Sequence, residues 1–383
     1  MNELPSMFNE YDEARQNGFI EVKKYKESGK KVVGTFCTYT PKELIHAAGG
    51  IAVSLCGTSN EPIADAEIDL PANLCPLIKS SYGFAITDKC PYFYFSDLIV
   101  GETTCDGKKK MYELLGEIKP MHVMQLPQNN VDQESMVLWK KEIMKLKDRI
   151  EKDFHVEITP EKLKEAINIH NEERKAKIQF YELGKLSPSP VTGMEILKVL
   201  YGSQFKLDKR ESIDYIKELT AKIKDEYENG QRATSPDAPR ILVTGCPIGG
   251  ATEKAIQAIE ENGGVVVCYE NCGGVKANSL LVDEDKEPIE AIAEKYLSIP
   301  CSVMSPNTKR LELLSKLIDE YKIDGVVEVI LQACHTYNVE ATSVKRFVNR
   351  EKNIPYINIE TDYSQNDIGQ LSTRMGAFLE MLY

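Results

Sequence analysis

Short apolar runs alternate with helical patterns at both ends of the chain, and this alternation constrains the fold more than any other feature. The apolar runs cover residues 31–36, 51–55, 93–100 and 121–126 in the first part of the chain, and 240–245, 264–270, 298–304, 324–331 and 354–360 in the last. Strands that alternate with helices imply parallel sheets covered by helices. We therefore expect an α/β fold with two similar open parallel sheets.

The middle of the chain carries a different pattern. Three stretches place apolar side chains at three- and four-residue spacing with charges between them: 135–154, 159–185 and 212–230. This spacing predicts amphipathic helices, with Trp139 in the core, Thr159 as an N-cap and Pro160 in the first turn. Residues 232–240 have the composition of a linker. We predict an N-terminal α/β domain at 1–128, a helical segment at 129–235 and a C-terminal α/β domain at 236–383.

Charge and hydropathy exclude several classes of protein. The chain has 383 residues and a net charge of −12, so it should not attract nucleic acid or anionic membranes. No apolar run approaches the ~20 residues needed to span a bilayer. The acidic, polar residues 1–16 do not resemble a signal peptide. These features predict a cytoplasmic protein.

The ten cysteines are the most informative residues. A single cysteine is usually a small buried hydrophobe, which is our interpretation of Cys268 inside a predicted strand. Ligands of open parallel sheets bind beyond the carboxyl ends of the strands. Six cysteines lie at or just past such ends: Cys37, Cys56, Cys105, Cys246, Cys272 and Cys334. We therefore expect their thiols to line the edges of a crevice between the two sheets.

The spacing of the cysteines in the sequence limits which metal or cofactor these thiols could bind. Structural zinc usually shows C-x₂₋₄-C pairs, and only Cys268 and Cys272 form one. The tight cysteine runs of ferredoxins are absent. Cys334 beside His335 could suggest a nucleophile, but no orienting third group is marked. An iron–sulfur cluster at a domain interface fits dispersed thiols best. Helix N-termini should lower the thiol pKa of four of them: Cys37, Cys105, Cys246 and Cys334.

Two glycine-bounded loops invite a nucleotide interpretation that the spacing does not support. Residues 101–115, GETTCDGKKKMYELL, have five residues between the glycines, whereas a Walker motif has four followed by Lys-Ser/Thr. Residues 244–250, TGCPIGG, lack the G-x-G-x-x-G spacing. The sequence therefore predicts no ATPase of its own. Lys108, Lys109 and Lys110 could balance the charge of a cluster, but a solvated first helical turn is the interpretation we favour.

Several motifs, taken in order, resemble one known family. They are TPKELIHAAGG, NLCPLIKSSYG, TTCDGKKKMYELL, TGCPIGG, YENCGGVK and DGVVEVILQACHTYNVE. The chain resembles subunits of the 2-hydroxyacyl-CoA dehydratase and benzoyl-CoA reductase family. The resemblance implies two Rossmann-like domains with a helical middle, and an oxygen-sensitive iron–sulfur cluster reduced by a separate ATP-dependent [4Fe–4S] activator protein. By motif, three cluster ligands would be Cys75, Cys105 and Cys334.

The additional strand-end cysteines set the chain apart from the plain dehydratases. In this it is most similar to the double-cubane cluster proteins, which are homodimers whose [8Fe–9S] cluster has six cysteine ligands. The second three ligands would come from Cys37, Cys246, Cys272 and Cys301, with Cys56 and Cys90 behind them. We predict Cys37, Cys272 and Cys301, with Cys246 as the close competitor.

Three functions follow from these features. The first is a reductase that passes low-potential electrons from an ATP-dependent partner to a small substrate. The second is one subunit of a 2-hydroxyacyl-CoA dehydratase with a single [4Fe–4S] cluster. The third is a non-catalytic cluster carrier. Glu43 could serve as an acid or base beside the cluster, although a first-turn carboxylate stabilised by the helix dipole is the interpretation we favour.

Overall fold

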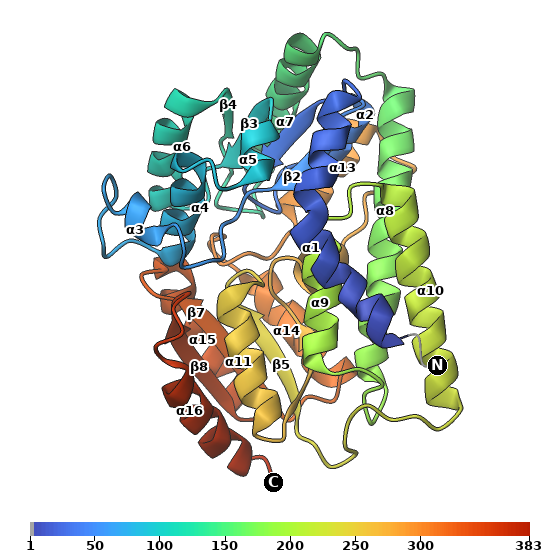
Figure 1. Ribbon diagram of the computed structural model, residues 1–383, viewed down its shortest axis with the longest axis vertical. Helices are drawn as coiled ribbons and strands as arrows, with labels where there is room; N and C mark the ends of the chain where they lie inside the picture. The colour runs from blue at the N-terminus through green and yellow to red at the C-terminus, as the bar shows by residue number, and fades with distance from the viewer. Residues whose placement is uncertain (1–3) are drawn as a thin grey trace.

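The computed structural model describes residues 4–383 and confirms the α/β class with two parallel sheets. Both sheets have four strands in the same order, β2-β1-β3-β4 and β6-β5-β7-β8, and every strand pairing is parallel. Figure 1 shows the first sheet above the second, joined by long helices along one side. The strands are β1 (Val32–Thr35), β2 (Ile51–Ser54), β3 (Leu98–Glu102), β4 (Met121–Met124), β5 (Arg240–Gly245), β6 (Val265–Tyr269), β7 (Gly325–Leu331) and β8 (Tyr356–Thr361).

The helices cover the sheets and fill the middle of the chain. None of the helices within residues 4–383 is long and apolar enough to cross a membrane. Their bounds are α1 (Leu4–Glu27), α2 (Lys42–Ala47), α3 (Ile63–Ala66), α4 (Pro76–Ile86), α5 (Pro91–Phe95), α6 (Asp106–Ile118), α7 (Gln133–Phe154), α8 (Pro160–Tyr181), the 3₁₀ helix η1 (Glu182–Lys185), α9 (Gly193–Gly202), α10 (Lys209–Glu228), α11 (Gly250–Glu261), α12 (Val275–Asn278), α13 (Pro288–Leu297), α14 (Thr308–Glu320), α15 (His335–Arg350) and α16 (Ile368–Glu380).

The helical middle forms as its sequence predicts. The Thr159 hydroxyl accepts a hydrogen bond from the Lys162 amide at the start of α8, with Pro160 in the first turn. The hydroxyl thus satisfies one of the amides that a helix start leaves without a partner. Trp139 on α7 is fully buried and packs edge-on against Tyr39, with ring centroids 6.4 Å apart. Both predictions are confirmed.

Two predicted strands are wrong or shortened. Residues 298–304 form turns, because Pro300 has no amide to donate to a ladder and the Met304 amide bonds back to the Cys301 carbonyl. The run 93–100 is helical up to Phe95, and β3 begins only at Leu98. Apolar runs of this length do not distinguish a strand from a short buried helix.

Packing crosses the predicted domain boundaries, which themselves remain predictions. Residues between Val282 and Met304, including α13, belong to the same hydrophobic core as β1, β3 and α7. Helices α8 and α9 contribute to the core of the C-terminal sheet. These shared cores hold the two sheets in fixed positions relative to one another. Residues just past the carboxyl ends of both sheets line one cavity.

Candidate metal centre

A cavity of about 1150 Å³ lies at the carboxyl ends of both sheets. Its lining comes from the segments that follow β1, β3, β5 and β7, and from the turns of residues 272–273 and 301–305. Cys268 is buried in β6 and does not line the cavity, as predicted for a core residue. The cavity is lined by nine of the ten cysteines: Cys37, Cys56, Cys75, Cys90, Cys105, Cys246, Cys272, Cys301 and Cys334.

Three of these thiols stand at the first turns of three helices. Cys75 precedes α4, Cys105 precedes α6 and Cys334 precedes α15, each as the N-cap residue. Burial and the neighbouring Cys334 raise the pKa of Cys75 to about 12, and Cys105 adds to this effect. The fold thus brings together three residues that are 30 and 229 positions apart in sequence. We call Cys75, Cys105 and Cys334 the helix-cap trio.

A second group of thiols lines the same cavity. Cys272 and Cys301 share a hydrogen bond, which lowers the pKa of Cys301 to about 5, with Lys276 and Arg310 adding electrostatic support for the thiolate. Both thiols also interact electrostatically with Cys37. We call Cys37, Cys272 and Cys301 the loop trio.

Cys246 follows β5 but does not lie with the loop trio. The charges that act on its thiol come first from Cys334 and Cys75, so it lies beside the helix-cap trio. Cys246 follows the first strand of the C-terminal α/β region, as Cys37 does in the N-terminal one, and this similarity made Cys246 the competing candidate for the second set of ligands. The tertiary structure places Cys246 and Cys37 in different groups of thiols. Cys56 and Cys90 also line the cavity, and the Cys56 thiol donates to the Phe36 carbonyl at 3.0 Å.

The expectation that helix N-termini lower the pKa of these thiols is wrong for Cys37, Cys246 and Cys334. Burial raises the pKa of Cys37 to about 12 and also raises the pKa of Cys246 and Cys334. The Tyr337 amide at the start of α15 does lower the pKa of Cys334, but burial has the larger effect. The free energy needed to desolvate a thiolate in a low-dielectric cavity exceeds the stabilisation that a helix N-terminus provides. A bound cation would favour the ionised form of these thiols.

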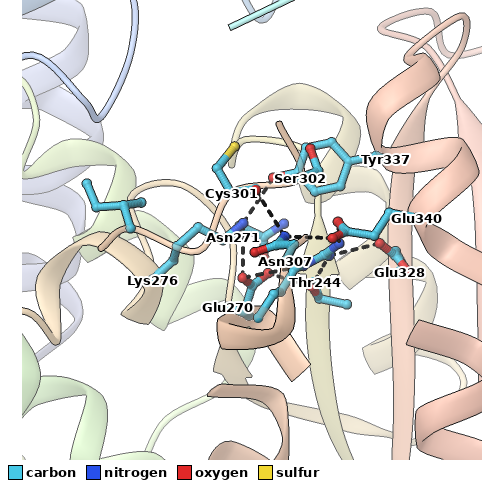
Figure 2. Close-up of polar contacts among 12 residues, drawn as sticks. Thr244, Glu270, Asn271, Lys276, Cys301, Ser302, Asn307, Glu328, Tyr337 and Glu340 are labelled. Carbon is cyan, nitrogen blue, oxygen red and sulfur yellow. Dashed lines mark hydrogen bonds and ion pairs between the residues drawn. The ribbon is translucent and has the colours of Figure 1, made fainter. Parts of the chain in front are cut away.

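A network of buried charges lies next to Cys301 of the loop trio (Figure 2). Arg310 is fully buried and pairs with Glu328 at 2.9 Å and with Glu340. Lys276, also fully buried, pairs with Glu270 at 3.0 Å and donates to the Tyr337 hydroxyl at 3.0 Å. These contacts fix the position of two cations close to Cys272 and Cys301.

The same network anchors the turn that carries Cys301. Asn307 donates to the Cys301 carbonyl at 2.9 Å and to the Glu340 carboxylate at 2.6 Å. Sequence reasoning missed Lys276 and Arg310. Lys276 ends the motif YENCGGVK and could have been noticed there, whereas nothing in the sequence around Arg310 marks it.

The position of Lys108 contradicts the expectation that Lys108, Lys109 and Lys110 form a solvated first helical turn. Its side chain is buried, its ammonium donates to the Phe36 carbonyl at 2.9 Å, and it interacts electrostatically with Cys37, Cys56 and Cys105. The interpretation as a solvated first turn is therefore wrong for Lys108. It holds for Lys109 and Lys110, whose side chains are exposed and pair with acidic residues of the same helix.

The comparisons with known proteins agree with this arrangement. The family model described as 2-hydroxyglutaryl-CoA dehydratase, D-component, matches residues 37–382. The chain belongs to this family. A protein of Escherichia coli (strain K12) described as a dehydratase subunit, YjiM, is 56% identical over 382 residues, which cover 100% of this chain and 99% of the relative.

More distant members of the dehydratase family extend over most of the chain as well. The (R)-phenyllactyl-CoA dehydratase beta subunit of Clostridium sporogenes is 26% identical over 100% of both chains. One of the benzoyl-CoA reductase subunits of Thauera aromatica is 23% identical over 88% of this chain and 84% of its own length. The relatives are thus enzyme subunits of two kinds, dehydratases and reductases.

The cavity fits an iron–sulfur cluster such as this dehydratase family is known for. Within residues 4–383 no three His, Cys, Asp or Glu side chains are placed as ligands of a single metal ion. Nine thiols nevertheless share one cavity, and thiolates are the ligands that iron–sulfur clusters prefer. A donor set made of sulfur and spread over two trios suits a cluster better than one ion.

Glu43 lies outside this cavity. It is in the first turn of α2, as expected, but its fully buried carboxylate pairs with Arg174 and accepts a hydrogen bond from the Tyr296 hydroxyl at 2.8 Å. Burial alone would raise the pKa of Glu43, but Arg174 and His170 hold it well below its usual range. This placement does not support a role as acid or base beside the cluster.

Replacing Glu43 with Gln should reduce stability rather than chemistry. The change leaves Arg174 buried without a counter-charge, and the amide can still accept one hydrogen bond, so we expect a loss of about 2–3 kcal/mol in the free energy of unfolding at pH 7. Because folding lowers the pKa of Glu43, its contribution is present above about pH 4.5 and is lost as the pH falls below that value. Urea unfolding at pH 7 and pH 3.5 should show the difference between wild type and variant shrinking in acid.

Glu134→Gln is the matched control for Glu43, because Glu134 is an exposed glutamate in the first turn of α7. It should leave stability unchanged. A Glu43→Gln variant with wild-type stability and lost turnover would instead support the catalytic role.

Proposed function

We propose that the chain holds a double-cubane [8Fe–9S] cluster and reduces a small substrate with electrons from an ATP-dependent partner. The observation that carries the proposal is the presence of two cysteine trios in one cavity. A single cubane would use only one trio as ligands and would leave the other three thiols unbound. The six ligands would be the helix-cap trio of Cys75, Cys105 and Cys334 and the loop trio of Cys37, Cys272 and Cys301.

When bound, such a cluster supplies low-potential electrons for one-electron chemistry. The chain's own residues hold it and adjust its surroundings. Lys108, Lys276 and Arg310 place three buried positive charges within electrostatic reach of the thiols, which offsets the negative charge of the thiolates. All three side chains are buried, so these charges act through a lower dielectric constant than that of water.

The proposed partner follows from what the sequence lacks and from what the relatives are. The sequence carries no Walker motif, so ATP would be used by a separate activator protein with its own [4Fe–4S] cluster. The relatives named above are all described as subunits, which supports function within an assembly. For this chain we propose a homodimer that docks the activator.

The alternative is a single-cubane subunit of a 2-hydroxyacyl-CoA dehydratase. The observation that favours it is the 26% identity to the (R)-phenyllactyl-CoA dehydratase beta subunit over the full length of both chains. In that case the helix-cap trio alone would hold a [4Fe–4S] cluster, and the thiols of the loop trio would be free.

Iron and acid-labile sulfide per chain separate these functions. After strictly anaerobic purification we expect about eight irons and about nine sulfides. About four of each would favour the dehydratase subunit, and CoA esters would become the substrates to test. A loaded cluster without any ATP-dependent turnover by activator and substrate would favour a carrier. Protein without iron would contradict all three.

A further inference from the structure

A second cavity lies between α2, α8, α10 and α13, and positive charge dominates its lining. Its volume is about 660 Å³, within the range of small-molecule sites. Nine lysine or arginine side chains line it, against three carboxylate side chains, in a chain whose net charge is −12. The described residues therefore concentrate cations at one place, contrary to the charge of the chain as a whole.

Some of these cations already have partners. Glu173 is buried and pairs with Lys177 at 2.8 Å and with Lys209 at 3.0 Å. Arg174 pairs with Glu43. Lys206 and Arg210 pair with Glu10 and Glu172, which lie outside the cavity lining. Even with these carboxylates counted, the nine cations outnumber the acidic side chains, so a surplus of positive charge remains.

Lys42 and Lys295 form no close ion pair among the described residues, although the carboxylates of Glu173 and Glu43 act on them electrostatically. Lys295 is only 6% exposed, and its ammonium lies 3.9 Å from the centroid of the Tyr296 ring. Burial and nearby Lys209 lower the pKa of Lys42 to about 8, and burial and Arg174 lower the pKa of Lys295. A desolvated ammonium without an ion-pair partner is costly, and an anion bound between the two would lower that cost.

This basic cavity borders the cysteine cavity. Thr38, Lys42, Lys177 and Gln204 line both. Lys42 follows the loop that begins at Cys37, so a ligand held at its ammonium would lie on the side of the loop trio. The basic cavity therefore adjoins the cysteine cavity and is not an isolated void.

We propose that the basic cavity binds a small polyanion, a molecule with several anionic oxygens such as a diphosphate, through Lys42 and Lys295. A single carboxylate would not balance the surplus, whereas several anionic oxygens would meet several ammonium groups at once. Lysines suit this role because they act as mobile point charges with three donors each. Binding does not require the proposed cluster, since none of its contacts is a thiol.

Calorimetric titration of the anaerobically purified holoprotein with inorganic pyrophosphate tests the proposal. We expect saturable binding that weakens at high salt and falls about tenfold for each of Lys42→Gln and Lys295→Gln, because each change removes a charge-assisted hydrogen bond. Lys141→Gln is the control, because Lys141 is an exposed lysine on α7 that does not line the cavity. Tricarballylate in place of pyrophosphate distinguishes a general polycarboxylate site from a phosphate site. Binding of neither probe, or equal binding by all three variants, would overturn the proposal.

A second measurement needs no variant and so does not depend on folding of a mutant. Acetic anhydride modifies accessible lysines, and mass spectrometry maps the sites. Pyrophosphate should protect Lys42, which is partly exposed in the cavity, in the wild-type protein while the exposed Lys141 reacts unchanged. Equal modification of Lys42 with and without pyrophosphate would contradict a site at this residue. Both measurements record binding rather than turnover, so their failure is distinct from failure of the proposed reductase.

Discussion

The double variant Cys37→Ala/Cys301→Ala is expected to lose about half of its iron, from about eight to about four per chain. The reason is that these two residues belong to the loop trio, which would hold one half of the cluster. Removal of the helix-cap trio residues Cys75 and Cys334 should have an effect of the same size. Iron and sulfide analysis after anaerobic purification gives the result directly. The single-cubane alternative predicts that Cys37→Ala/Cys301→Ala keeps its full iron content.

Two cysteines of the same cavity serve as controls for this experiment. Cys90 lines the cavity at the start of α5 but belongs to neither trio, so Cys90→Ala should keep its iron. Cys246→Ala tests the competing ligand candidate, which lies beside Cys75 and Cys334. Iron loss in Cys90→Ala equal to that in the trio variants would show that the cavity collapses whenever a thiol is removed, and would remove support for the ligand assignment.

Replacing Arg310 with Met is expected to destabilise the iron-free protein by about 5 kcal/mol. The reason is that removing one partner of a buried ion pair leaves the other partner's charge buried and uncompensated. Arg310 is fully buried, and Glu270, Glu328 and Glu340 hold its pKa well above the usual range against the effect of burial. Without the guanidinium, these carboxylates lie near one another, and among the described residues Lys276 pairs with Glu270 alone of the three. Urea unfolding followed by circular dichroism measures the loss.

The matched control for Arg310 is Arg346→Met, an exposed arginine on α15, which should leave stability unchanged. Adding Glu328→Gln to Arg310→Met should recover part of the loss, since it removes one of the stranded charges. An Arg310→Met variant as stable as Arg346→Met would show that the network does not hold the fold together. A stable variant that also loads iron normally would show that Arg310 has no part in supporting Cys301.

The sequence was enough to predict the two parallel sheets, the helical middle and the gathering of thiols at one edge. Periodicity reports which face of an element is buried, and the carboxyl ends of parallel strands lie at a common edge wherever the strands go. This is why cysteines that follow strands could be expected at a crevice and Cys268 within a strand could be assigned to the core.

Only the tertiary structure decided which thiols are neighbours and which charges are buried. The symmetry of the chain made Cys246 the close competitor of Cys37 as a ligand. Packing places Cys246 beside Cys75 and Cys334, and Cys37 beside Cys272 and Cys301. Lys108 and Arg310 look like ordinary surface cations in sequence. They are buried because elements distant in the chain close over them, and the energy of a charge depends on those neighbours rather than on its own segment.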